Sequence, residues 1–320
     1  MTINSLTKIS DYGIFGFIKI NLRGASQVMF QSSAWCGILF LAGIFWGAYT
    51  TGYNTMAWGA LLGLVISTIT GFILNLPIDD GYQGLWGFNG ILVGCAFPAF
   101  LGNSIAMWLS LSLCAAFTTW LRVGLNNIMR PWKVNSLTFP FVLSTWLFLL
   151  AAHAMHALRA LHHSHIISHR PMHLALKSMD SFGGVVEAWL NNISQVFLIE
   201  SWVTGVLFLV GIAICNRWAA LWAAVGSALA IGVAQVMGIN SHQIAEGLYG
   251  FSAVLTAIAL ATVFYRPSWR SALWTLLGII FTVFVQAAMN IWLHPYSMAT
   301  LTAPFCITTW LFLLPKLKLE

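Results

Sequence analysis

Two threonines stand at matching places in apolar stretches of the chain, and their setting suits hydrogen bonding. Thr138 begins the string Thr-Phe-Pro-Phe and Thr302 begins Thr-Ala-Pro-Phe. Proline breaks a helix interior but is tolerated at a helix start, so we expect each threonine just ahead of a short helix. A hydroxyl offers one donor and two acceptor positions. The motif predicts a polar point inside an apolar setting, with capping of its own helix as each threonine's alternative role.

A second doubled motif carries aromatic side chains. The copies are GLWGFN at 84–89 and GLYGFS at 247–252. Phe88 and Leu92 are four residues apart and share a helix face, and Phe251 and Leu255 repeat that pair. One phenylalanine from each copy, facing a common axis, would form a flat apolar slot. Ordinary helix packing is the alternative, as it is for the glycines of the first copy, whose spacing of three and four favours close helix contact.

A third pair, Ser-Gln-Val, begins at 26 and again at 194. It places Gln27 and Gln195, each with a carbonyl and an amide group, at equivalent points of the two copies. We expect them at the two entrances of a path that the other motifs line.

The elements that must position these residues are apolar helices. Hydrophobic residues make up 59% of the 320 residues and charged residues only 7%, whereas a soluble domain carries about 25% charged residues. Most of this surface must therefore contact lipid, which excludes an aqueous globular enzyme. The five cysteines lie in or beside apolar runs with no close pair, so we interpret them as small buried hydrophobes.

Ten apolar stretches are candidates for membrane-spanning helices, since a bilayer core needs roughly 20 apolar residues per helix. They lie near 35–49, 55–75, 90–101, 104–121, 139–152, 199–215, 217–237, 251–264, 271–290 and 303–315. With a cytoplasmic N-terminus and ten crossings, only Arg159, Arg170 and Lys177 of the 14 basic residues fall outside. The positive-inside rule then predicts that both termini are cytoplasmic.

The three doubled motifs recur in the same order at offsets of 168, 163 and 164 residues, which indicates an internal repeat. Five spans per copy is an odd number, so the second copy starts on the opposite side of the membrane. We predict an all-α membrane protein of two inverted five-helix repeats, with half-helices lining a central pore. The predicted domains are 1–152, a linker at 153–180 and 181–320.

We find no charged residue at the centre of a predicted span, and so no coupling site for Na⁺ or H⁺. This favours a channel and a small, flat, neutral solute with several N–H donors and one carbonyl, because an ion would lose hydration there. A channel for ammonia or short amides and an ion-coupled transporter of a neutral solute are the alternatives. We expect no enzyme activity, no cofactor, no bound metal and no nucleic-acid partner.

Seven of the nine histidines fall between 153 and 173, in the predicted external linker. His162, His165, His169 and His173 would line one helical face. A solvated linker helix is our interpretation. A periplasmic Zn or Ni site and a lid that responds to pH are the alternatives, because histidine binds metals and titrates near neutrality.

Together these motifs resemble the urea transporter family of facilitative channels, over nearly the whole chain. The resemblance implies a bacterial urea channel of the cell inner membrane, a pore in each protomer and a homotrimer within the lipid bilayer. By matching position it implies one mouth at Gln27, Phe30, Phe88 and Leu92, and a middle constriction at Thr138 and Thr302. The resemblance implies the other mouth at Gln195, Val196, Leu198, Phe251 and Leu255.

Two residues depart from the family pattern at the second mouth. Leu198 stands where the first copy has Phe30, and Gln195 stands where some members have an acidic residue. The second mouth therefore has less aromatic surface and less negative charge. These departures affect the expected selectivity among urea analogues rather than the class of transport.

Overall fold

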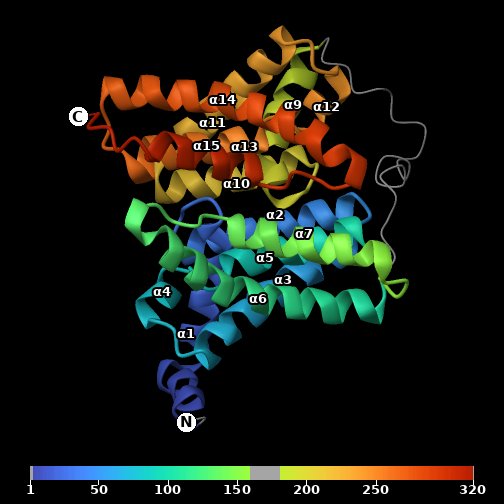
Figure 1. The fold of residues 1–320 in the computed structure, drawn as a ribbon, viewed down its shortest axis with the longest axis vertical. Helices are drawn as coiled ribbons and strands as arrows, with labels where there is room; N and C mark the ends of the chain where they lie inside the picture. The colour runs from blue at the N-terminus through green and yellow to red at the C-terminus, as the bar shows by residue number, and fades with distance from the viewer. Residues whose placement is uncertain (1–2, 159–180, 320) are drawn as a thin grey trace. The chain divides into compact units, whose positions relative to one another are not determined.

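The computed structural model describes residues 3–158 and 181–319, with side chains from residue 13 onward. The chain divides into two compact units, Met1–Leu161 and His162–Glu320. Figure 1 shows that the described part of each unit is built from helices, so the all-α expectation is confirmed.

The first unit contains seven α-helices and one short 3₁₀ helix within residues 3–158. They are α1 (Ile3–Gln27), α2 (Ala34–Thr50), α3 (Asn54–Ile73), α4 (Ile78–Tyr82), α5 (Phe88–Phe100), α6 (Ile105–Met129), η1 (Arg130–Trp132) and α7 (Phe139–Ala154). Helix α5 packs against α3, α6 and α7, so it forms the centre of this unit.

The second unit repeats this order within residues 181–319. Its helices are α9 (Phe182–Ser194), η2 (Gln195–Phe197), α10 (Trp202–Cys215), α11 (Arg217–Val236), α12 (Ser241–Ala245), α13 (Phe251–Ile258), η3 (Ala259–Phe264), α14 (Trp269–Leu293), η4 (His294–Tyr296) and α15 (Ala303–Leu313). Here α13 takes the central place, in contact with α11, α14 and α15. It continues into the π-helical turn η3.

All ten apolar stretches expected from the sequence are helical. The largest difference in their bounds is at 104–121, where α6 runs on to Met129. The apolar pattern of the sequence did not predict α1, α4, α9 and α12. Lys19 and Arg23 interrupt the apolar pattern of α1, and Asn191 and Asn192 interrupt that of α9, so neither helix shows a continuous apolar run.

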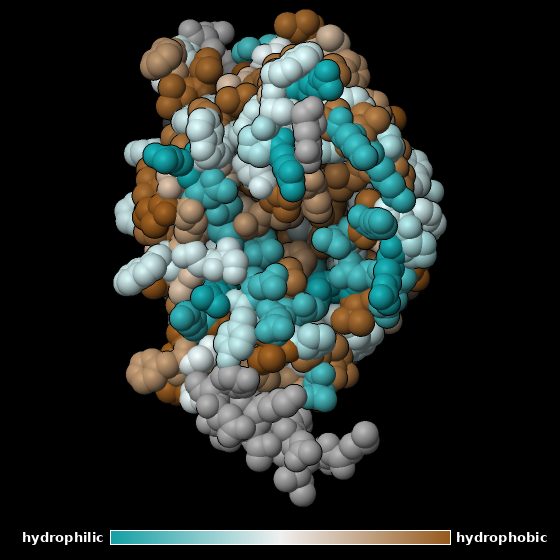
Figure 2. Space-filling model, turned by 90° about the vertical axis from the view of Figure 1, so that its left-hand side faces the viewer, coloured by the Kyte–Doolittle hydropathy of each residue, from teal (hydrophilic) through white to brown (hydrophobic). Residues whose placement is uncertain are grey.

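Among the described residues, four helices are long and apolar enough to cross a bilayer. They are Asn54–Ile73, Ile105–Trp132, Arg217–Val236 and Trp269–Tyr296. The pair Phe182–Phe197 and Trp202–Cys215 would make a fifth span, although it is bent by 75°. Large apolar side chains such as Ile105 and Phe182 are exposed, and Figure 2 shows apolar residues mixed with polar ones on one face of the surface. These features are those of a multi-pass membrane protein.

The correspondence between the two copies extends to the backbone. Residues with positive φ occur in matching pairs. The pairs are Phe30 and Leu198, Gly84 and Gly247, Lys133 and Ser297, and Leu137 and Leu301. The left-handed conformation costs an L-residue with a side chain about 1–2 kcal/mol. Its recurrence at the same places therefore indicates that both copies need the same turns.

Two further sequence interpretations concern the cysteines and the histidines. The cysteines are all free, and four are buried as expected, but Cys215 is exposed at the end of α10. The predicted face of His162, His165, His169 and His173 lies outside the described residues. Within the described residues, no group of three or more His, Cys, Asp or Glu side chains is placed to hold a metal ion.

Candidate functional site

Thr138 and Thr302 occupy identical positions at the starts of α7 and α15. Their backbone angles are nearly the same, with φ −90° and ψ 10° at Thr138 and φ −89° and ψ 16° at Thr302. In both helices the proline is the second helical residue, as the sequence predicts. Both threonines are 2% exposed, so each side chain is buried.

Neither threonine side chain forms a capping hydrogen bond to its own helix. The alternative interpretation of these residues as caps is therefore wrong. In the first unit another residue takes that role, because Oδ1 of Asn89 accepts the backbone N–H of Phe141 at 3.2 Å. Sequence reasoning missed Asn89, although it is the last residue of the doubled GLWGFN motif.

Phe88 and Leu92 lie in the first two turns of α5, and Phe251 and Leu255 lie in the first two turns of α13. The phenylalanines are 7% and 6% exposed, and both leucines are fully buried. The hydrogen bond from Phe141 to Asn89 brings the start of α5 close to the start of α7. In the second unit α13 contacts α15, which brings the equivalent elements together.

The glycines of the motif are required by close packing. Gly84 has φ +81°, and a Cβ atom there would lie 2.4 Å from the carbonyl carbon of Arg23. Gly247 has the same φ, and its Cβ atom would lie 2.6 Å from the carbonyl carbon of Asn191. A side chain at Gly84 would push the turn before α5 away from α1. A side chain at Gly247 would push the turn before α13 away from α9. The packing interpretation made for the first copy is thus confirmed for Gly84.

The predicted entrance residues lie at the turns that follow α1 and α9. Phe30 and Leu198 have φ values of 62° and 60°, and these turns lead into α2 and α10. Gln195 is 8% exposed, and its Nε2 donates to the backbone oxygen of Glu246 at 2.8 Å. Val196 is 2% exposed, and Gln27 is half-buried. The amide of Gln195 is therefore fixed to the residue that follows α12.

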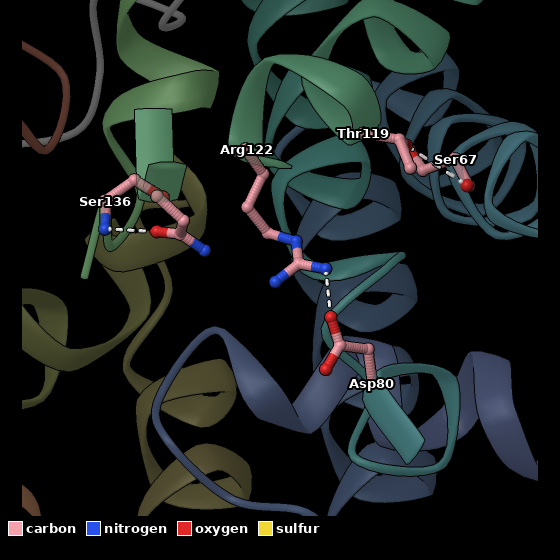
Figure 3. Close-up of polar contacts among 6 residues, drawn as sticks. Ser67, Asp80, Thr119, Arg122 and Ser136 are labelled. Atoms are coloured by element: carbon pink, nitrogen blue, oxygen red, sulfur yellow. Dashed lines mark hydrogen bonds and ion pairs between the residues drawn. The ribbon is translucent and has the colours of Figure 1, made fainter. Parts of the chain in front are cut away.

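An ion pair and a charged hydrogen bond stabilise the segment that precedes the GLWGFN motif at 84–89. Nη2 of Arg122 lies 2.6 Å from Oδ2 of Asp80, and Nη1 of Arg23 donates to the oxygen of Tyr82 at 2.8 Å. Figure 3 shows Arg122 reaching from α6 to Asp80 on α4, while Thr119 of α6 lies against Ser67 of α3. These contacts fix α4, and α4 leads directly into residues 84–89.

In each unit an aromatic ring, a leucine and a threonine hydroxyl, all buried and uncharged, thus lie on two helices that contact each other. Such a set can stack on a flat solute and accept or donate hydrogen bonds, but it offers no charge to replace the hydration of an ion.

Comparisons with known proteins agree with this chemistry. A family model described as urea transporter matches residues 18–317. Urea transporter 1 of Ovis aries is 27% identical over 318 residues, covering 94% of this chain and 78% of the relative. Urea transporter 1 of Capra hircus is 27% identical over 318 residues, with the same coverage. The Rattus norvegicus protein of that name is 26% identical over 317 residues, covering 94% and 77%.

Proposed function

This chain belongs to the urea transporter family, and from that premise we propose that it conducts urea passively across the cell inner membrane. The observation that carries the proposal is the family match over residues 18–317, which includes all three doubled motifs. The buried, uncharged half-sites support a channel for a neutral solute rather than an enzyme.

We propose ten crossings with both termini cytoplasmic, arranged as inverted repeats at 1–152 and 181–320 with an external linker at 153–180. The matching positive-φ positions support two copies of one backbone plan. Helices of 10–17 residues such as α5 and α7 support half-helices, because a span of the full core needs about 20 residues. The homotrimer is proposed from the family resemblance.

In the proposed path, urea passes one mouth, the middle constriction and the second mouth in turn. The first mouth is formed by Gln27, Phe30, Phe88 and Leu92, the constriction by Thr138 and Thr302, and the second mouth by Gln195, Val196, Leu198, Phe251 and Leu255. Urea is planar, so aromatic and aliphatic surfaces admit it edgewise. Hydroxyl and carbonyl oxygens accept its N–H groups, while an ion finds no group that replaces its water.

The alternatives are less well supported by the described residues. An ammonia channel is expected to hold a histidine in its pore, but His153, His156 and His294 are exposed and His242 is half-buried beside Glu246. A coupled transporter needs a charged group that binds and releases an ion. The ion pair of Arg122 and Asp80 instead neutralises its own charges.

The test is urea flux into proteoliposomes, followed by stopped-flow light scattering. We expect rapid urea flux that does not change when a proton gradient is removed. The flux of formamide and acetamide, measured in the same vesicles, ranks the selectivity among these solutes. Thr138→Val and Thr302→Val should each slow urea flux about tenfold, since each lost hydroxyl removes about 1.4 kcal/mol of compensation for lost water. Flux no faster than in protein-free vesicles would refute transport, and unchanged flux in both variants would remove the threonines from the path.

A further inference from the structure

We propose that Asn89 is a positioning residue, which caps α7 from the neighbouring helix so that the hydroxyl of Thr138 does not turn back to cap its own helix and keeps its place in the proposed path. The proposal rests on the proposed function in one respect, namely that Thr138 contacts the solute. The capping itself rests on contacts within the first unit.

The first turn of α7 has a single N–H that a side chain can cap. An N-cap side chain normally accepts from the second or third helical residue. The second is Pro140, which has no N–H, and the first, Phe139, already donates to the oxygen of Ser136 at 3.0 Å. Only the N–H of Phe141 remains, so the side chains of Thr138 and Asn89 compete for one donor.

Asn89 holds that donor in the structure. Its Oδ1 lies 3.2 Å from the nitrogen of Phe141, whereas Thr138 makes no capping bond. Asn89 is 2% exposed, and its Nδ2 is buried without a hydrogen-bond partner among the described residues. An unpaired buried amide lowers stability. Asn89 therefore keeps an unpaired amide nitrogen at a cost in stability, while its amide oxygen accepts from the N–H of Phe141 that Thr138 would otherwise cap.

The second unit lacks this arrangement. Ser252 stands at the place of Asn89, and its buried hydroxyl has no partner, so it does not bond to Phe305. The hydroxyl oxygen of serine is one bond closer to the backbone than the amide oxygen of asparagine, so it reaches less far toward a neighbouring helix. The second unit therefore supplies a natural comparison: Thr302 should not depend on residue 252, whereas Thr138 should depend on residue 89.

Loss of the Asn89 carbonyl would leave the N–H of Phe141 buried and unpaired, which is unfavourable. Thr138 is the nearest side chain in sequence that can satisfy it, by adopting the ordinary capping rotamer. Its hydroxyl would then be directed at its own helix and would no longer be oriented toward the solute. The expected result is slower urea flux without loss of the fold.

The experiment is a double-mutant cycle of Asn89→Leu and Thr138→Val, with urea flux measured in proteoliposomes. Leucine is close to asparagine in volume and has no polar group. We expect Asn89→Leu to slow flux about three- to tenfold. In the Thr138→Val background the same change should alter flux by less than about twofold, because the hydroxyl is already absent. Ser252→Ala is the matched control and should leave flux unchanged.

A second readout is hydrogen–deuterium exchange in the peptide that contains Phe141. Its amide should stay protected in Asn89→Leu, where Thr138 takes over the cap, and lose protection only when both residues are replaced. If Asn89→Leu does not fold, Asn89→Ser, which copies the second unit, replaces it in both measurements.

The outcomes separate the two proposals. Unchanged flux in Thr138→Val refutes the role of Thr138 in the path, whatever Asn89 does. Slower flux in Thr138→Val together with unchanged flux in Asn89→Leu overturns the positioning role alone. An equal loss of flux from Asn89→Leu in both backgrounds, or loss of amide protection in the single variant, also overturns it and indicates a general packing role.

Discussion

The two units share one backbone plan but stabilise it with different polar groups. In the first unit, Arg23 donates to the oxygen of Tyr82. At the equivalent place in the second unit, Asn191 donates to the oxygen of Ala245 at 2.9 Å. The same link between an amphipathic helix and the end of a short helix is therefore made once by a cation and once by a neutral amide.

The ion pair of the first unit has a neutral counterpart as well. At the place of Arg122 the second unit has Gln286, whose Nε2 donates to Thr300 at 2.6 Å and to Asn290 at 3.0 Å. The difference has a physical cause in the proposed topology. Matching ends of inverted copies face opposite sides of the membrane, and only the cytoplasmic side favours basic residues. The backbone is thus constrained by the fold, and the charge by the side of the membrane.

The largest effect is expected where the two copies contribute the same group. Replacing both Thr138 and Thr302 by valine should slow urea flux about a hundredfold if the two hydroxyls act independently, since each single change costs about tenfold. Stopped-flow light scattering of all four proteins measures this. Thermal unfolding of the same samples controls for folding. A loss carried entirely by one threonine would show that the two halves are functionally unequal.

The next effect distinguishes the charged unit from the neutral one. Asp80→Asn leaves Arg122 without its carboxylate, and the Arg122 side chain is only 7% exposed. Because Asp80 is 31% exposed, we expect a loss of about 2 kcal/mol in the free energy of unfolding, below the value for a fully buried pair. Unfolding in detergent measures it.

The matched control for that change copies the second unit, which has Gln243 and Gln286 at these places. The double variant Asp80→Gln and Arg122→Gln should recover part of the lost stability, because it removes both charges. Full stability in Asp80→Asn would show that the ion pair is dispensable.

A smaller effect concerns the spacing between central helices. A Cβ atom at Gly90 would lie 1.6 Å from Oγ of Ser67, whereas the second unit already has Ala253 there. Gly90→Ala should therefore lower the free energy of unfolding by about 1–2 kcal/mol, because overpacking forces α3 and α5 apart. Gly124→Ala, with nothing within 4 Å of the added atom, is the control and should be neutral or slightly stabilising. Equal unfolding temperatures for the two variants would contradict the close-packing argument.

Much of this fold could be predicted from the sequence because apolar runs and doubled motifs are local signals. The start of α7 was predicted from Pro140, and the close packing of α5 from the glycine spacing. Helices α1 and α9 were missed because they are amphipathic, and hydropathy alone does not separate such helices from loops. The turns at Phe30 and Leu198 have no propensity signal, since bulky residues rarely adopt positive φ.

Within the candidate site, the residue types were predictable and their partners were not. The cap on α7 depends on the tertiary contact between Asn89 and Phe141, which are 52 residues apart. Nothing local indicates that a residue on α5 satisfies a donor on α7. The only sequence signal was the place of Asn89 directly after Phe88 in a motif that occurs twice.

The smallest predicted effect compares the two entrance glutamines. Gln195 is almost buried and donates to the oxygen of Glu246, while Gln27 is half-buried. Gln195→Leu removes the hydrogen bond to the oxygen of Glu246 and should cost about 1 kcal/mol of stability, whereas Gln27→Leu should cost less than about 0.5 kcal/mol. Urea flux should fall about two- to threefold in each, because both glutamines belong to the proposed mouths rather than to the proposed constriction. Unfolding temperature and flux are measured on the same preparations. An equal loss of stability in both variants would mean that the bond to Glu246 does not distinguish the two entrances, and a tenfold loss of flux from either one would place the main barrier at that mouth instead of at the threonines.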